Sequence, residues 1–255
     1  MPGQRRSLSE QREHVRSGLR KVELRARRDL LRFPRRVRCP ICGWTGAALA
    51  SSSKPRKPNR MCPRCGSSER YRAIELLLRR RGPVAPGTRL LEISPIGTVE
   101  PTATSLGYSF TGISFDLEDS QVTTYGRLEA LPFASGIFDI VVCLHVLEHI
   151  IDDRSAVREL ARVLAPGGEA LVNVPWDPAR PVTFEDQSSD PSQNHALYGQ
   201  ADHVRVYGAD VTSRWTDAGV EVEEERWVER FTPDVHRYAA LDGRDDRFWI
   251  VTTRT

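Results

Sequence analysis

From residue 89 onward, short apolar runs alternate with stretches of helical periodicity, and this rhythm restricts the fold more than any other feature of the sequence. Such alternation is typical of a mostly parallel sheet whose strands are joined by crossover helices. We therefore predict an α/β, doubly wound domain. The candidate strands span residues 90–93, 110–113, 140–143, 170–174, 220–224 and 248–252.

Charge is distributed unevenly along the 255 residues. Residues 1–88 contain 23 Lys and Arg against 6 Asp and Glu, a net charge of +17, whereas residues 89–255 carry −14. We therefore expect two modules with different electrostatic character, of which the basic one would attract polyanions such as RNA. An arginine-rich, solvated surface is the alternative explanation.

The hydrophobic content of 39% is enough for a core, and the length suits one α/β domain with a small accessory module. No stretch approaches the ~20 consecutive apolar residues that a membrane span requires. The arginine-rich N-terminus also lacks the apolar centre of a secretory signal. These features predict a cytoplasmic protein.

The N-terminal part is expected to hold a helix and then a small module. Ser7 and Glu10 have capping-box spacing, and apolar residues recur at helical intervals, so residues 8–33 are predicted to form an amphipathic helix. Its basic face suits packing on its own domain, a partner helix or an anionic surface. The predicted units are this basic helix (1–37), a cysteine module (38–70) and the α/β domain (71–255), whose first helix starts near Ser68.

Four of the five cysteines form two Cys-x-x-Cys-Gly turns about twenty residues apart. Two intervening residues let one turn aim both sulfurs at a single tetrahedral ion, and the glycine accepts a left-handed backbone. Disulfides are the alternative, but a chain without a secretory signal is expected in a reducing compartment. We predict a zinc-ribbon-like module with a closed, structural Zn²⁺ site whose ligands are Cys39, Cys42, Cys62 and Cys65. Cys143, in an apolar run, is expected to be a buried hydrophobe.

Residues 89–97 have the pattern of a buried strand that runs into a turn, with a helix beginning near Thr98. Nucleotide-like ligands bind at such carboxyl strand ends, although a plain strand-to-helix turn is the alternative. The glycine pattern is incomplete, because Ser94 and Pro95 stand where glycines are usual. About twenty residues later, Asp116 follows the second strand, where a carboxylate can hold a ribose diol.

Four further motifs follow in order: LPF at 131–133, FD at 138–139, HVLEH at 145–149 and RVLAPGG at 162–168. This ordered series resembles the class I S-adenosylmethionine (SAM)-dependent methyltransferases of the type 11 group, over residues 71–255. The resemblance implies a Rossmann-like sheet of seven strands, SAM as the cofactor and methyl transfer as the reaction. Asp139 of the FD motif is expected to be structural.

A narrower resemblance rests on TFED at 183–186, YGQADHVRVYG at 198–208 and the CPRCGSSERYR segment at 62–72. These segments are similar to a bacterial subgroup of methyltransferases that carry an N-terminal cysteine head. An insertion over residues 177–210 is expected to cover the methyl acceptor.

The class I resemblance also implies the cofactor contacts. The first strand and its turn would line the methionine and ribose, and Asp116 would accept hydrogen bonds from the ribose hydroxyls. Arg127 stands where the family has an Asp, which leaves the next two residues as candidates for the adenine. The implied cofactor-binding residues are Glu92, Ser94, Gly97, Asp116, Leu128, Glu129 and His145.

A hydroxyl acceptor must lose a proton during methyl transfer, and histidine suits that task near neutral pH. The candidate bases are His145 and His203, and a packed or capping histidine is the alternative for each. Arg205 could bind an anionic acceptor through its bidentate fork. The candidate acceptor-binding residues are His149, Glu185, Asp186, Asp202, Arg205 and Tyr207.

Three functions fit these patterns. The first is methyl transfer to an oxygen or nitrogen of a small molecule or glycan. The second is an RNA methyltransferase whose basic head binds nucleic acid, but only Trp44 and Tyr71 could offer stacking platforms in that head. The third is a non-catalytic binding protein, suggested by the missing glycines and by Arg127. The first fits best.

Overall fold

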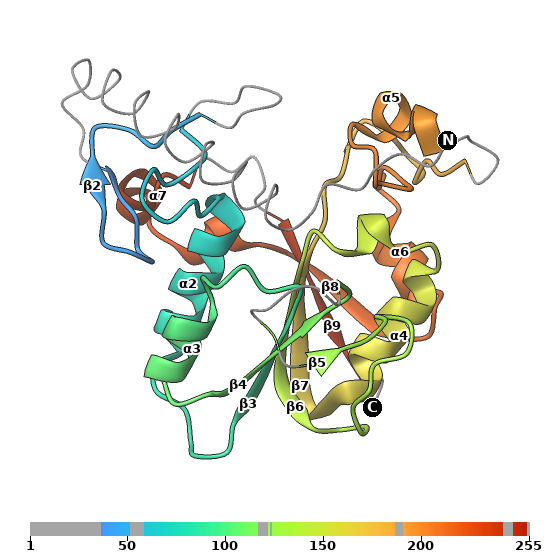
Figure 1. Cartoon of the computed structure of the whole chain (residues 1–255), viewed down its shortest axis with the longest axis horizontal. Helices are drawn as coiled ribbons and strands as arrows, with labels where there is room; N and C mark the ends of the chain where they lie inside the picture. The colour runs from blue at the N-terminus through green and yellow to red at the C-terminus, as the bar shows by residue number, and fades with distance from the viewer. Residues whose placement is uncertain are drawn as a thin grey trace.

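The structure, a computed structural model, describes residues 37–51, 59–116, 122, 124–186, 191–241 and 247–253. The helix predicted over residues 8–33 lies outside this part of the chain. The described residues form a central sheet between two helical layers, with a small cysteine module beside one layer (Figure 1). No described helix is both long and apolar enough to cross a bilayer.

The central sheet has seven strands: β3 (Arg89–Ile93), β4 (Ser109–Ser114), β5 (Thr124–Tyr125), β6 (Phe138–Leu144), β7 (Leu164–Asn173), β8 (Glu221–Arg226) and β9 (Arg247–Thr252). Their order is β5-β4-β3-β6-β7-β9-β8. The paired strands from β5 to β7 are parallel, and β9 runs antiparallel to both of its neighbours. The predicted doubly wound, mostly parallel sheet is therefore confirmed.

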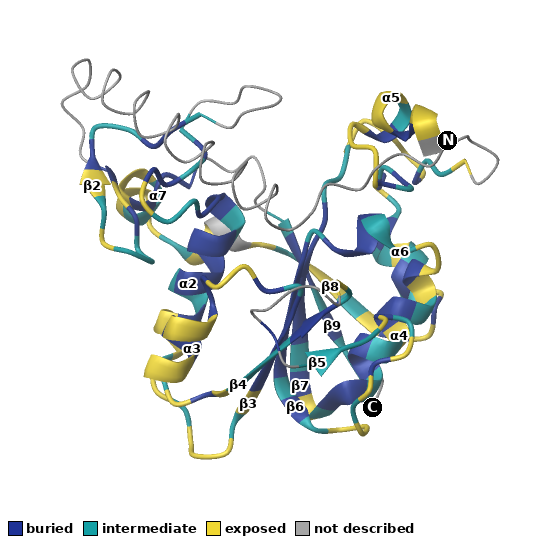
Figure 2. Cartoon of the chain, in the orientation of Figure 1, coloured by how far each residue is buried: buried dark blue, intermediate teal, exposed yellow. Residues whose placement is uncertain are grey.

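Helices cover both faces of this sheet. The first face holds α2 (Glu69–Arg81), α3 (Glu100–Ser105) and α7 (Pro233–Ala239), and the second holds α4 (Asp153–Val163) and α6 (Val211–Thr216). The shorter helical segments are η1 (Leu147–His149), η2 (Pro191–Gln193), α5 (Asn194–Tyr198) and η3 (Trp227–Arg230). Central strands enclosed in this way must be apolar on both sides, and β3 and β6 are largely buried (Figure 2).

Local sequence explains where the two longest helices begin. Ser68 is the N-cap of α2, as predicted, and Glu69 in its first turn and arginines in its last turn complement the helix dipole. Asp152 caps α4, because its carboxylate accepts a hydrogen bond from the Ser155 backbone at 3.0 Å. Asp139 has the structural role that we expected, since it accepts a 2.7 Å hydrogen bond from the Arg89 backbone between β6 and β3.

The cysteine module begins with a short antiparallel pair, β1 (Val37–Arg38) and β2 (Thr45–Gly46). An apolar cluster that includes Val37, Leu49 and Ala240 packs this module against the residues that follow α7. Arg72 of α2 is fully buried and donates to the carbonyls of Arg60, Ser67, Ala239 and Ala240 at 2.7–3.0 Å. This one guanidinium thus connects the module, α2 and the end of α7.

Candidate functional site

The strand order reverses between β3 and β6, which places a topological switch point at the carboxyl ends of these neighbouring strands. In open α/β sheets, ligands bind at such switch points. Ser94 and His145 directly follow the two strands, and both have a left-handed backbone, with φ values of 52° and 55°. Non-glycine residues in this conformation are strained and concentrate at functional sites. The switch point is therefore the candidate ligand site.

Adjacent strands hold both strained residues in place. The Ser94 backbone N–H donates to the Ile113 carbonyl at 2.8 Å, and the His145 N–H donates to the Asn173 carbonyl at 2.7 Å. Ser94 thus adopts the conformation that a glycine would take in a usual nucleotide-binding turn, and Gly97 follows with a φ of 76°. Ser94 in place of a glycine weakened the nucleotide-binding sequence pattern, but the backbone still forms the glycine-like turn.

Glu92 is the buried acidic group of this site. Its side chain is 2% exposed, and its Oε2 atom has no hydrogen-bond partner among the described residues. Burial raises the pKa of Glu92 to about 8, and the charge of nearby Glu100 adds to this effect. A positively charged ligand group at Oε2 would offset the cost of this burial.

Two further buried polar atoms have no partner in the described chain: Nε of Arg70, and Oγ1 of Thr98, which follows β3. Arg70 lies in the first turn of α2, with its Cζ atom 5.2 Å from the centroid of the Tyr71 ring. Sequence reasoning did not single out Arg70 as a site residue. Its position before a buried tyrosine in a motif is the only signal that could have indicated it.

The other predicted cofactor residues follow the neighbouring strands. Asp116 is exposed just after β4, and its backbone N–H donates to the Ser114 hydroxyl at 3.2 Å. Leu128 and Glu129 follow β5; the Leu128 side chain is buried, and the Glu129 carboxylate lies 3.1 Å from Arg127. Because Leu128 packs into the core, only its backbone is suited to contact a ligand. These cofactor contacts stay predictions.

The segment after β6 carries a second polar cluster. His145 Nδ1 lies 3.2 Å from Oε1 of Glu148, which is fully buried in η1. The rings of His149 and His203 meet edge to face with their centroids 4.7 Å apart. The Val204 N–H donates to the Glu148 carbonyl at 2.9 Å, so the insertion docks against η1 here. The structure therefore brings the three predicted histidines together around Glu148, which the sequence analysis did not select.

Electrostatics in this cluster favour a charged Glu148 and a neutral His203. Burial alone raises the pKa of Glu148, but the interaction with the nearby His145 imidazole, together with smaller contributions from its surroundings, outweighs burial, so the net shift of the pKa is downward. Burial lowers the pKa of His203, which is 4% exposed. Asp202 is largely exposed, and its carbonyl oxygen lies 3.1 Å from His149 Nδ1.

We revise the expectation that Arg205 binds an anionic acceptor. Its guanidinium is buried and donates to the carbonyls of Leu147 and Ile151 at 2.8 Å, to the Ile150 carbonyl, and to Glu185 at 3.1 Å. These hydrogen bonds engage all three nitrogen atoms of the guanidinium group. Arg205 therefore fastens the insertion to the loop after β6, because its donors already have protein partners.

Glu185 and Tyr207 are revised for the same reason. Glu185 accepts hydrogen bonds from Arg214 as well as from Arg205. Tyr207 is fully buried, and its hydroxyl donates to Asp153 at 2.9 Å. Both residues thus belong to an anchoring network on α4 and α6. Asp186 is exposed, and its backbone bonds to the Tyr198 hydroxyl at 2.9 Å, so an acceptor role for its side chain stays a prediction.

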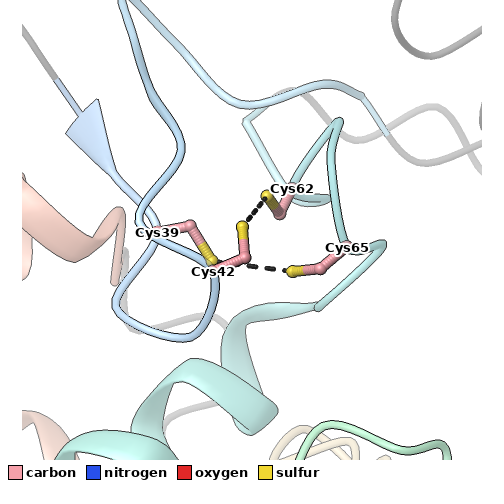
Figure 3. Close-up of side chains that lie close together, drawn as sticks. All are labelled: Cys39, Cys42, Cys62 and Cys65. Carbon is pink, nitrogen blue, oxygen red and sulfur yellow. Dashed lines mark hydrogen bonds between the residues drawn. The ribbon is translucent and has the colours of Figure 1, made fainter.

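The four predicted zinc ligands form a separate cluster in the N-terminal module, where both cysteine turns face one another (Figure 3). Cys39 Sγ lies 3.7 Å from Cys65 Sγ, and Cys42 Sγ lies 3.5 Å from Cys62 Sγ. Disulfide sulfurs lie about 2.05 Å apart, so these pairs are thiols. Tetrahedral Zn–S bonds of about 2.3 Å would place the sulfurs about 3.8 Å apart, close to the observed spacing.

Backbone geometry in both turns agrees with this pattern. Gly43 and Gly66 have left-handed φ values of 71° and 74°, as predicted. Their N–H groups donate to the carbonyls of Cys39 and Cys62 at 2.9 Å, which closes each turn. Cys143 has no part in the cluster: it is fully buried in the core, and burial raises the pKa of its thiol, as expected for a packed residue.

A mostly parallel seven-stranded sheet with a switch point between β3 and β6 defines a Rossmann-like fold. Residues 103–172, which contain β4 to β7, match a family model described as a methyltransferase domain. The chain is 43% identical to an uncharacterized methyltransferase of Bacillus subtilis, YcgJ, over 60 residues, which are 24% of each chain. It is 35% identical to the 27-O-demethylrifamycin SV methyltransferase of Amycolatopsis mediterranei over 104 residues, 34% of this chain and 38% of the relative.

Among solved structures, the crystal structure of YcgJ from B. subtilis aligns with a TM-score of 0.49 and 17% identity, covering 72% of this chain and 99% of that chain. The sequence alignments to the two relatives span a quarter to about two fifths of their lengths. The family match and the methyltransferase relatives support a SAM-dependent methyltransferase.

Proposed function

We propose that this protein transfers a methyl group from SAM to an oxygen or nitrogen atom of a small molecule or glycan. One observation carries the proposal: the β3/β6 switch point combines two strained residues, Ser94 and His145, with the buried Oε2 atom of Glu92, which has no partner in the described chain. The match of residues 103–172 to a methyltransferase domain supports the choice of cofactor.

The buried polar atoms fit the amino acid end of SAM. Glu92 would accept hydrogen bonds from its ammonium group, and the Arg70 guanidinium would bind its carboxylate. The turn from Ser94 to Gly97 would approach the ribose with its backbone, and Asp116 would accept hydrogen bonds from the ribose hydroxyls. Adenine would lie near the Leu128 backbone and Glu129. Bound SAM would supply an electrophilic methyl group.

The protein's own task is then to hold the acceptor in line with that methyl group and, for a hydroxyl, to remove a proton. His145 is the first candidate base, since it stands at the switch point and Glu148 orients its ring through the 3.2 Å contact at Nδ1. His203 is the second candidate, and the insertion that carries it would cover the acceptor. His149, Asp186 and Asp202 are the remaining candidates for acceptor contacts.

A small-molecule acceptor is favoured by the rifamycin-modifying relative, whose name gives a small-molecule O-methyl acceptor. RNA methylation is the alternative that we expected from the basic N-terminal module. Binding of single-stranded RNA usually requires exposed aromatic side chains on which the bases can stack. Two aromatic pairs in or beside the insertion instead pack internally: Trp176 lies edge to face on Trp249, and Phe184 packs on Tyr198.

We also propose that the four cysteines bind one structural Zn²⁺. Their sulfur spacing, the closed turns and the absence of a disulfide among the five described cysteines support this role. Four protein ligands would leave no open position, so the ion would stabilise the module and take no part in chemistry. The module joins the α/β domain through Arg72, so zinc would also support α2, which carries Arg70.

Calorimetric titration with S-adenosylhomocysteine, with metal analysis of the same sample, tests the proposal. We expect micromolar binding and about one zinc per chain from the cysteine site. Glu92→Gln should weaken binding at least about tenfold, because it removes a charge partner of the ligand ammonium. Glu221→Gln, at an exposed position of β8, is the matched control and should bind normally.

A folded, zinc-loaded protein that binds no S-adenosylhomocysteine would refute the methyltransferase proposal and favour a binding protein that has kept the fold. Acceptors can then be screened with methyl-labelled SAM, starting with hydroxylated small molecules and sugars. An RNA gel shift at physiological ionic strength decides between the two acceptor classes, because non-specific electrostatic binding weakens steeply with salt. Tight, salt-resistant binding of RNA would favour RNA as the methyl acceptor.

A further inference from the structure

Glu148, His149 and His203 form a cluster with the composition of a metal site, apart from the four cysteines. One possible ligand atom from each of the three residues lies within 4.8 Å of the others. Glu148 and His149 come from η1, directly after β6, and His203 comes from the insertion. The hydrogen bond from the Val204 N–H to the Glu148 carbonyl holds these two segments together.

The buried atoms of this cluster lack hydrogen bonds. Glu148 is fully buried, and neither of its carboxylate oxygens accepts a hydrogen bond of good geometry in the described structure, although Oε1 faces His145. Nε2 of His203, 4% exposed, is likewise without a partner in the described residues. Buried charged and polar groups are normally paired or bound to a metal, because an uncompensated one is costly. A cation between Glu148 and His203 would satisfy both residues.

His149 is oriented as a metal-binding histidine would be. Its Nδ1 atom lies 3.1 Å from the Asp202 carbonyl oxygen and 3.4 Å from the Asp202 carboxylate. Both groups are acceptors, so Nδ1 carries the proton and Nε2 keeps its lone pair. Metal-ligating histidines commonly donate their other nitrogen to a carboxylate or a backbone carbonyl in this way.

The donor set indicates the class of ion. Two imidazoles and one carboxylate suit first-row transition metals and zinc, whereas Mg²⁺ and Ca²⁺ prefer oxygen ligands alone. Three protein ligands leave coordination positions open, unlike the closed four-cysteine site. The open positions would be available to a ligand beside His145, because Glu148 contacts both His145 and this cluster.

We propose that Glu148, His149 and His203 bind a divalent transition metal or zinc, and that its open positions hold the methyl acceptor through two neighbouring oxygen atoms. The acceptor class is therefore a hydroxyl compound with an adjacent oxygen donor, such as a vicinal diol, a catechol or a hydroxy acid. The acceptor role rests on the proposed methyltransferase function; metal binding does not. In this arrangement His203 is a ligand, which leaves His145 as the candidate base.

The test begins with the full chain loaded with one zinc at the cysteines, titrated with Co²⁺. We expect a second metal equivalent with weak visible absorption and without the sulfur-to-cobalt charge-transfer bands of a thiolate site. The variants His149→Ala, His203→Gln and Glu148→Gln should each weaken this second equivalent at least about tenfold, as metal-ligand changes do. His195→Ala, an exposed histidine on α5, is the matched control and should retain it.

Retained zinc at the cysteines and retained S-adenosylhomocysteine binding report that each variant is folded. A wild-type chain that takes up no second equivalent, or ligand variants that bind Co²⁺ like the control, would overturn the proposal. A second equivalent without any S-adenosylhomocysteine binding would uphold the metal site while the methyltransferase function fails. If the acceptor role is correct, a catechol should shift the Co²⁺ spectrum of the wild type but not of His149→Ala; an unchanged wild-type spectrum would refute that role.

Discussion

Arg72→Lys is expected to loosen the connection between the cysteine module and the α/β domain. The arginine makes hydrogen bonds of 2.7 Å to Ala239, 3.0 Å to Arg60, and 2.9 Å to Ser67 and Ala240, all to carbonyl oxygens, from a fully buried guanidinium. Lysine keeps the charge, but its compact ammonium cannot reach acceptors on opposite sides of a planar fork.

The loss can be estimated from these contacts. Hydrogen bonds to charged groups contribute about 1.5–3 kcal/mol each, so losing two of the four should cost about 3–6 kcal/mol. For a chain of this size, each kcal/mol lowers Tm by about 2–4 °C. We therefore expect a fall in Tm of about 6–24 °C. Zinc release to a chromogenic chelator should also accelerate, because the Ser67 and Arg60 carbonyls flank the second cysteine turn.

Arg79→Lys is the matched control, since Arg79 lies on the same helix but is half exposed and pairs only with Glu75 among the contacts described. Lysine keeps the positive charge beside the buried Glu75 carboxylate, and a single contact is affected instead of four, so this variant should melt close to the wild type. Equal melting temperatures and equal zinc-release rates for the two variants would refute the reasoning that Arg72 couples the module to the domain.

Two further predictions concern buried carboxylates. Because the pKa of Glu92 is raised from 4.5 to about 8, the folded chain keeps a proton that the unfolded chain releases, and Glu92 costs stability as pH rises through this window. Glu92→Gln should therefore be more stable than wild type at pH 9, by up to about 5 kcal/mol, and equal to it at pH 4 in thermal melts; a pH-independent difference would contradict this. Asp153→Asn should destabilise by about 3–5 kcal/mol in urea, because Arg205 and Arg214 lose a buried counter-charge. Asp152→Asn keeps a good N-cap and should be neutral, so similar urea midpoints for the two variants would count against the buried network.

Features encoded within a few neighbouring residues could be predicted from the sequence. Apolar runs located five of the six longer strands because strands enclosed between helices must be apolar on both faces. The sixth, β8, is a mostly exposed edge strand rich in glutamate, and only its first residues overlap the predicted range. The spacing of the cysteines fixed their clustering, since each turn is a local structure that aims its own two sulfurs. β5 was missed because two residues, Thr124 and Tyr125, are too short to show a period.

Features that depend on distant partners could not be predicted. Glu148 sits between two histidines in the motif, but only the docking of the insertion reveals that it is buried beside His203. Arg70 appeared as part of a motif, and nothing in the sequence showed that its Nε atom would be buried without a partner in the described chain. Cofactor and metal assignments of single residues therefore require the tertiary arrangement.

The structure of the insertion explains why Arg205 does not bind an anionic acceptor, as its residue type had suggested. The described residues between 177 and 210 have little regular structure beyond η2, α5 and two isolated bridges, Trp176 to Tyr207 and Phe184 to Val206. A segment with so few backbone hydrogen bonds to neighbouring strands needs side-chain contacts to hold it in place.

Its anchors are two arginines, Arg205 and Arg214, which face two carboxylates, Asp153 and Glu185. The charges of this network cancel, so it offers no net positive charge to an anionic acceptor. Burial also removes its donors from reach. Recognition of the acceptor must then depend on the groups that the network holds in position. Among the described residues of the insertion, His203 is the buried side chain that the network leaves with a nitrogen available. The anchoring role of Arg205 and the ligand role proposed for His203 are therefore complementary parts of one arrangement.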